Sequence, residues 1–334
     1  MTNTLTIGAT RVEVDKSKPD RRTFVGGSDV AAVLGVSPWK TPLDLYDEKI
    51  SAEPIPDLDK PVFKRGKRWE GAALEMLLEA LADNGTIAKV IATNRVYHDE
   101  EHPWMRCEID AELLIDGQIF NVEIKTVSVF ASKDWGEGET DEVPIHYQSQ
   151  AMQGLGITGR RTCIVGALFG ADKLVPYFID RDEATIKGMR ERIAHFWHNH
   201  VQARIAPEPQ NLADILKLFA ATNGVPVEAT PEIRAAVDAL RDIRSQIKRL
   251  EEDEKDQVFT IADFVRKEWK LAKDEQPKDN ALLIVNGTAI LSWAKQRGSS
   301  LDQKKLKVEH PEIVKDYTRE HWFRVMRPKK PKTK

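Results

Sequence analysis

The sequence predicts an α/β fold of the α+β kind: a mixed central sheet flanked by helices, followed by a mostly helical C-terminal extension. Apolar segments come in the order helix, strand, hairpin, helix, strand pair, helix. A strong hairpin signal lies in the middle of this order, and the composition becomes more charged after residue 210. We therefore expect one domain over residues 1–210 and an extension over residues 211–334.

Residues 1–20 are polar, and Thr4 to Val14 within them could form a short strand. The first predicted helix follows this segment. Ser28 is a good N-cap after a Gly-Gly pair, and Gly35 is suited to end the helix. A second helix is expected after Thr41, which is followed by proline.

The start of the first helix could also bind an anion, because free backbone N–H groups there would lie near Arg21 and Arg22. On the local pattern alone, simple capping is the preferred interpretation, since it needs no ligand.

The next predicted helix covers KRGKRWEGAALEMLLEALADNG and ends near Gly85. Its apolar stripe consists of Leu74, Leu77, Leu78 and Leu81. Glu70 lies one turn earlier on the same stripe, so its carboxylate could point towards the core. Alternatively, Glu70 only complements the helix N-terminus. A strand is expected over residues 87–98.

The central hairpin covers residues 104–127, in which Asp116 and Gly117 separate two runs of strand-forming residues. A two-residue loop would place Asp110 opposite Glu123 and Glu108 opposite Lys125. The other face would be apolar, with the opposed pairs Ile109 and Ile124, Ala111 and Val122, and Leu113 and Phe120.

Carboxylates facing each other across a hairpin repel unless a cation lies between them. A divalent ion beside Lys125 would relieve the repulsion between Asp110 and Glu123. For Glu108 and Glu112, an ordinary solvated face is the preferred interpretation.

A Gly-rich acidic loop that carries Lys133 and Trp135 follows the hairpin and could act as a lid. A helical segment then carries Tyr147, Gln150 and Gln153. Two apolar strands and a helix from Asp182 to about residue 206 complete this region.

Composition limits the functional classes. The net charge is −3, so contact with nucleic acid would depend on local basic patches. The two cysteines, Cys107 and Cys163, form no disulfide framework and have no metal-ligand spacing. No apolar run is long enough to span a membrane and no signal-peptide pattern is visible, so a cytoplasmic location is the default expectation.

The extension begins with apolar residues at steps of three and four from Pro231 to Asp256, a pattern typical of a short coiled coil or helical hairpin. Asn286 and Gly287 predict a small hairpin near residues 281–293. A helix starting at Pro311 and containing Tyr317 and Trp322 is expected before the basic end. The extension could bind DNA or a partner, assemble the chain into oligomers, or pack on the first domain.

A family resemblance rests on GGSDVAAVLGVSPWKTPLDLY, on Gly66 to Glu70, on Asp110, on Glu123-Ile124-Lys125 and on WGEGETDEVPIHYQSQ. In this order, these segments resemble the YqaJ-type phage recombination nucleases, which are similar to the lambda-exonuclease branch of the PD-(D/E)XK fold. The resemblance covers roughly residues 20 to 210.

The resemblance implies a Mg²⁺-dependent exonuclease, with Mn²⁺ as a substitute ion, that resects ends of linear double-stranded DNA in recombination, commonly 5′ to 3′. It also implies a trimeric ring and a single-strand annealing protein as partner. The implied metal ligands are Glu70, Asp110, Glu123 and the backbone carbonyl of Ile124. Lys125 would complete the catalytic set: it would stabilise the developing charge and, less readily, position or help deprotonate the attacking water.

Residues near the 5′ phosphate are also implied by the resemblance: Arg21 or Arg22, and Ser28, with Tyr147 and Gln150 supporting the site. One departure is Gly154, where the family often has an aromatic residue. Two alternatives to the exonuclease remain: a metal-dependent endonuclease, and a protein that binds DNA ends without significant nuclease activity.

Overall fold

The computed structural model describes residues 20–53, 61–219, 225–268, 280–294, 297–319 and 328. The chain divides into two compact units, Met1–Asn223 and Gly224–Lys334. The predicted strand from Thr4 to Val14 lies outside the described residues. No helix among the described residues is long and apolar enough to cross a membrane.

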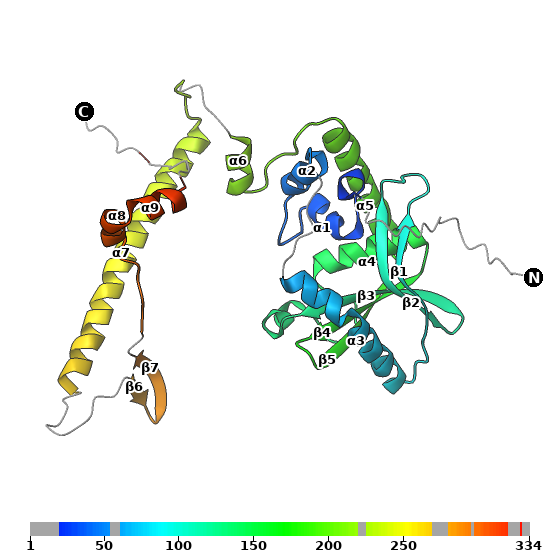
Figure 1. Ribbon diagram of the computed structural model, residues 1–334, viewed down its shortest axis with the longest axis horizontal. Helices are drawn as coiled ribbons and strands as arrows, with labels where there is room; N and C mark the ends of the chain where they lie inside the picture. Colours follow the sequence, from blue (N-terminus) through cyan, green and yellow to red (C-terminus); the bar gives the residue numbers. More distant parts are fainter. Residues whose placement is uncertain are drawn as a thin grey trace, which may run out of the picture. The chain divides into compact units, whose positions relative to one another are not determined.

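The first unit is built around a five-stranded mixed sheet in the order β1-β2-β3-β4-β5 (Figure 1). The strands are β1 (Lys89–His98), β2 (Arg106–Ile115), β3 (Gln118–Val127), β4 (Thr162–Phe169) and β5 (Lys173–Asp180). Strands β3 and β4 are parallel, whereas the other neighbours are antiparallel. This confirms the predicted mixed sheet.

Helices cover both faces of this sheet. The helices of the first unit are α1 (Gly27–Leu34), α2 (Pro42–Ile50), α3 (Pro61–Asp83), α4 (Ile145–Thr158), α5 (Glu183–His195) and α6 (Leu212–Leu218). Short helical turns are η1 (Arg21–Thr23), η2 (Val129–Asp134) and η3 (Phe196–Gln202), the last of which is a π-helix that continues α5. Helix α3 packs its predicted stripe, with Leu77 and Leu81 buried, on one face. Helices α1, α2, α4 and α5 share a second apolar cluster on the other face.

The central hairpin forms with the predicted turn, since Ile115 pairs with Gln118 and Asp116 and Gly117 both have positive φ. The ladder runs only to the pair Ala111 and Val122. Beyond it, Asp110 Oδ2 accepts a hydrogen bond of 2.7 Å from the Ile124 backbone N–H. A side chain thus takes the place of a backbone partner, and the predicted pairs of Asp110 with Glu123 and of Glu108 with Lys125 are wrong as ladder pairs.

The predicted single apolar face also changes at this point. Ala111 and Leu113 pack under α3, whereas Ile109 joins the cluster on the α4 side. The change of face coincides with the end of the β2–β3 ladder at Asp110, where the regular alternation of the strand no longer holds.

The prediction that Glu112 lies on a solvated face is wrong. The residue is buried rather than solvated, and its Oε1 forms an ion pair of 2.9 Å with Arg160 Nη2. Tyr97 donates a second hydrogen bond to the same carboxylate. A buried carboxylate needs such partners to offset its desolvation, and the predicted solvated face applies only to the exposed Glu108.

The N-cap of α1 is Gly26 rather than the predicted Ser28, because Asp29 is the residue whose side chain accepts from the Gly26 N–H (3.1 Å). Gly35 ends the helix in the left-handed conformation, as predicted. Thr41 caps α2, also as predicted.

The second unit contains α7 (Pro231–Glu268), the hairpin of β6 (Asn280–Val285) and β7 (Thr288–Ala294), and α8 (Gln303–Glu309) and α9 (Pro311–Tyr317). The hairpin prediction at Asn286 is confirmed. The helix predicted from Pro311 ends at Tyr317, and Trp322 lies outside the described residues.

Candidate active site

The candidate site lies where β3 meets α4. Glu123 and Lys125 are alternate residues of β3, and Lys125 Nζ lies 2.9 Å from Glu123 Oε2. Gln150 of α4 binds both, donating to Glu123 Oε2 at 2.7 Å and accepting from Lys125 Nζ at 3.1 Å. These three side chains form a closed triangle of charge-assisted hydrogen bonds.

The other two predicted carboxylates border this triangle. Asp110 is oriented by the Ile124 N–H, and its charge adds to burial in raising the pKa of both Glu123 and Glu70. For Glu70, burial is the larger cause of the raised pKa, and a hydrogen bond with Asn94 opposes it. The fold thus gathers the four residues predicted from the sequence within electrostatic range of one another.

Burial dominates the electrostatics of Glu123, which is 3% exposed. Burial raises its pKa to about 7, against the opposing charge of Lys125. Burial alone would lower the pKa of Lys125, but the charges of Glu123 and Asp110 outweigh it and raise the pKa above the ordinary value. Lys125 is therefore a permanent cation at neutral pH.

The donor set fits a hard divalent cation by its chemistry, because Glu123 and Asp110 lie within electrostatic range of one ammonium, and the charge of Asp110 adds to burial in raising the pKa of Glu70 and Glu123. The arrangement is not a ready-made cage. Among the described residues, no group of three or more His, Cys, Asp or Glu side chains is placed to hold a metal ion. Glu70, Asp110 and Glu123 would have to draw together around the ion.

Helix α1 packs against the same site at Gly27. A Cβ atom on Gly27 would lie 3.3 Å from Gln150 Cγ, so the N-terminus of α1 packs against the glutamine that binds Glu123 and Lys125. The segment before α1 is tied to the start of β2, since Arg106 N–H donates to the Val25 carbonyl at 2.9 Å.

Arg21 and Ser28 lie together at this helix start. Arg21 Nη2 donates to Ser28 Oγ (3.1 Å) and to Asp29 Oδ1 (3.1 Å), and buried Lys49 binds Asp29 Oδ2 at 2.8 Å. Arg22 has different partners: Asp20 and the carbonyls of Ser51 and Ala52. Of the two candidate arginines, Arg21 is therefore the one placed beside Ser28.

Helix α4 needs the glycine that departs from the family pattern. A Cβ atom on Gly154 would lie 3.1 Å from Ile109 Cδ1 and 3.4 Å from Asn121 Nδ2. The helix thus approaches the sheet too closely for a large side chain at this position.

Several residues near the site were not predicted. Asn94, whose side chain bonds Glu70, has positive φ within β1, and only its residue type hinted at this. Trp39 and His146 border Tyr147, with ring centroids 6.3 and 4.1 Å from its ring. Their proximity depends on the packing of α4 beside the loop between α1 and α2, which sequence spacing does not reveal.

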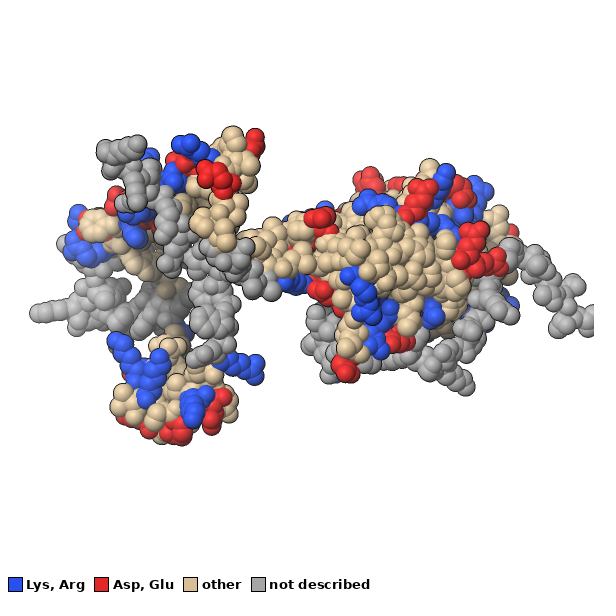
Figure 2. All heavy atoms as spheres, turned by 90° about the horizontal axis from the view of Figure 1, so that it is seen from above, with Lys and Arg blue, Asp and Glu red and all other residues tan. Residues whose placement is uncertain are grey.

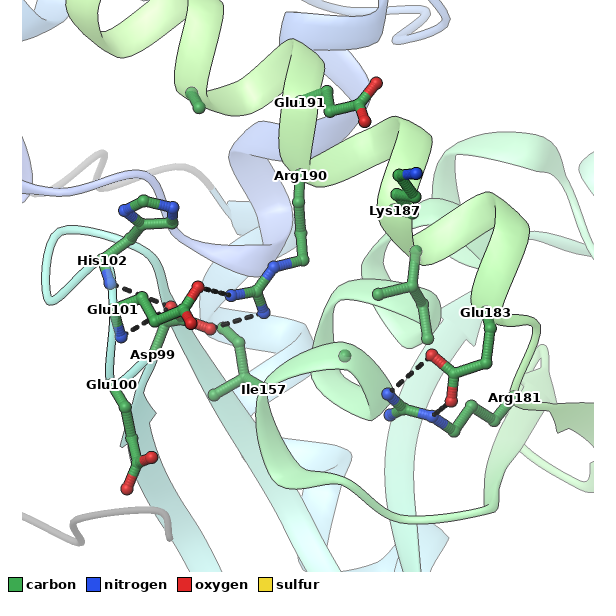
Figure 3. Close-up of a pocket in the computed structure, with 13 residues that line it drawn as sticks. Asp99, Glu100, Glu101, His102, Ile157, Arg181, Glu183, Lys187, Arg190 and Glu191 are labelled. Carbon is green, nitrogen blue, oxygen red and sulfur yellow. Dashed lines mark hydrogen bonds and ion pairs between the residues drawn. The ribbon is translucent and has the colours of Figure 1, made fainter. Parts of the chain in front are cut away.

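A hollow of about 590 Å³ lies elsewhere in the first unit, between the β1–β2 turn and α5 (Figure 3). Two ion pairs lie in its lining: Arg190 with Asp99 at 2.5 Å, and Arg181 with Glu183 at 2.5 Å. It contains none of the predicted site residues. We therefore do not place the active site there.

Comparison with known proteins shows which proteins this chain resembles. Residues 18–161 match the model of the YqaJ-like viral recombinase domain, so the resemblance inferred from the sequence is confirmed for this part of the chain. A particular relative is the protein YqaJ of Bacillus subtilis (strain 168), which is 25% identical over 312 residues, covering 91% of each chain.

The solved structures to which this chain is similar include two exonucleases. An alkaline exonuclease from Laribacter hongkongensis matches 55% of this chain and 91% of its own, with 17% identity and a TM-score of 0.42. A phage-related exonuclease from Haemophilus somnus 129PT matches 54% of this chain and 95% of its own, with 11% identity and a TM-score of 0.37.

Proposed function

We propose that this protein is a metal-dependent deoxyribonuclease of recombination, an exonuclease that resects linear double-stranded DNA in the 5′ to 3′ direction. The observation that carries the proposal is the Glu123, Lys125 and Gln150 triangle, bordered by Asp110 and Glu70. The match to a viral recombinase domain supports the biological setting.

Glu70, Asp110, Glu123 and the carbonyl of Ile124 would hold Mg²⁺ or Mn²⁺. A bound ion of this kind lowers the pKa of a water ligand and polarises the phosphoryl oxygen. Lys125, kept protonated by its acidic neighbours, would stabilise the negative charge that develops on the phosphoryl group. Its raised pKa makes it a poor general base.

Arg21 and Ser28 would receive the terminal 5′ phosphate. Asp29 is the residue that orients this pair: burial alone would raise its pKa, but the charges of Lys49 and Arg21 outweigh burial and lower it. The ionised Asp29 thus fixes the Arg21 guanidinium beside Ser28. A homotrimer and a single-strand annealing partner belong to the same proposal.

The test compares linear and covalently closed circular duplex in Mg²⁺, with the wild type, Glu123→Ala and Lys125→Ala. We expect the wild type to release nucleotides from the linear DNA only, and both variants to lose at least about 100-fold in rate. Cleavage of circles would support the endonuclease alternative. Tight end binding without release in any divalent metal would support the end-binding alternative, and undiminished digestion by both variants would contradict the site.

A further inference from the structure

We propose that Trp39, backed by His146, forms a stacking subsite for a nucleobase of the DNA end, next to the phosphate held at Lys125. This inference rests on the proposed function, since it takes the substrate to be a DNA end, and it adds a substrate-positioning residue that the proposed reaction does not itself require.

Trp39 is 70% exposed, whereas the other described tryptophans of the first unit are buried or half-buried. Most of the ring therefore adds nothing to the core. Its edge-to-face neighbour is His146, at 4.7 Å between ring centroids and an interplanar angle of 80°. The ring is thus supported from one side and open to a ligand on the other.

A row of rings connects this indole to the candidate site. The His146 ring lies 4.1 Å from that of Tyr147, and Lys125 Nζ lies 5.4 Å from the centroid of the Tyr147 ring. Burial, followed by the charge of Lys125, lowers the pKa of His146. At neutral pH the ring behind the indole is therefore uncharged, which suits an aromatic stack.

The loop that carries Trp39 is held in place at both ends. The backbone N–H groups of Val36 and Ser37 donate to the Ala31 carbonyl at 2.9 and 3.1 Å, and Thr41 begins the next helix with its capping bond. Pro38 precedes the tryptophan and restricts the backbone further. A pre-organised ring loses little conformational entropy when it binds a flat ligand.

These features favour a nucleobase over an apolar protein surface. The exposed area is a single flat ring beside a cationic site that would hold phosphate, and every base offers a face to such a ring. The same combination of basic and aromatic groups is common where proteins bind single strands without sequence preference.

The experiment uses the full chain and a duplex whose terminal nucleotide is 2-aminopurine, with Ca²⁺ replacing Mg²⁺ during binding. The fluorescence of this base falls when it stacks on an aromatic ring. We expect quenching by the wild type and by Trp39→Phe, and loss of quenching by Trp39→Ala. The dissociation constant of Trp39→Ala should rise roughly 5- to 150-fold, the range expected for one lost stacking contact.

Ile87→Ala is the matched control, because Ile87 is an exposed apolar residue (87%) on the segment between α3 and β1, and it should bind like the wild type. Trp39→Ala that quenches and binds like the wild type would overturn the subsite and leave Trp39 as a protein contact. Nucleotide release in Mg²⁺ tests the proposed function separately. If the wild type releases no nucleotides but shows Trp39-dependent quenching, the stacking subsite is supported and the proposed nuclease activity is contradicted.

Discussion

At the scale of single residues, Glu123 combines deep burial with two hydrogen bonds to one of its oxygens, from Lys125 and Gln150. Burial without these partners would leave an uncompensated charge that costs several kcal/mol. The pKa of Glu123 is nevertheless raised, because the effect of burial exceeds that of these partners. A group in this condition is well suited to bind a cation.

The pH dependence of metal binding follows from this pKa. Because the pKa of Glu123 is raised to about 7, its carboxyl keeps a proton below that pH, and an ion must displace the proton. We expect the affinity for Mg²⁺ to rise roughly tenfold between about pH 6 and pH 8, as ionisation increases from about a tenth to about nine-tenths. Calorimetric titration at both pH values measures this. Equal affinities would show that Glu123 is ionised throughout.

Gln150 is the residue that aligns Glu123 with Lys125, so we expect Gln150→Ala to lower the rate of nucleotide release about 10- to 100-fold. The loss should appear in kcat more than in KM, because the substrate contacts remain. The control is Gln148→Ala on the same helix, for which we expect wild-type kinetics. An unchanged kcat in Gln150→Ala would contradict a role of this glutamine in aligning Glu123 with Lys125.

At the scale of elements, the position of α4 on the sheet decides whether β3 and the helix can share a site. Gly154 permits the close approach, since a Cβ there would meet Ile109 at 3.1 Å. We expect Gly154→Leu to destabilise the fold by about 1–3 kcal/mol through overpacking. Urea unfolding measures the change.

Gly71→Leu on α3 is the matched control, because a Cβ at that exposed helical position meets nothing within 4 Å. There, the better helix propensity of leucine should raise stability by about 0.5–1 kcal/mol. Equal effects at the two glycines would contradict the close packing of α4.

The elements also show how far sequence reasoning reaches. The turn at Asp116 and Gly117 and the stripe of α3 were predictable because each depends on local chemistry and on a fixed period. The burial of Glu112 was not, because its partner Arg160 follows α4, almost 50 residues later, and nothing local indicates that the two will meet.

The end of the β2–β3 ladder at Asp110 could not be predicted from the sequence either. Register arithmetic assumes that every residue keeps a backbone partner, whereas here a carboxylate accepts the Ile124 N–H instead. For the site, the family resemblance nominated Glu70 and Gln150, while Asn94 and Trp39 emerged only from the packing.

At the scale of the whole molecule, all the candidate site residues lie in the first unit, Met1–Asn223. With a net charge of −3, the chain does not attract DNA over its whole surface, and Figure 2 shows basic and acidic side chains intermixed on the face that it displays. DNA binding should therefore depend on local contacts at the site.

We propose that the first domain extends beyond residue 210 to include α6. Asp214, only 1% exposed, accepts hydrogen bonds from Thr41 Oγ1 (3.0 Å) and from the Gln210 N–H (2.9 Å). We expect a chain ending at residue 210 to be about 1–3 kcal/mol less stable than one ending at residue 223, because both hydrogen bonds to the buried Asp214 are lost. Thermal unfolding of both measures the difference, and equal stability would place the boundary at residue 210.

Glu123 and its neighbours are proposed to form a metal-dependent nuclease site. The most direct measurement follows nucleotide release from linear duplex while Mg²⁺ is titrated, with the wild type and Glu123→Ala, together with DNA-end binding by both. We predict saturable, Mg²⁺-dependent release by the wild type and almost none by Glu123→Ala, which still binds DNA ends. Equal release by the two proteins, or release that persists in EDTA, would contradict the claim.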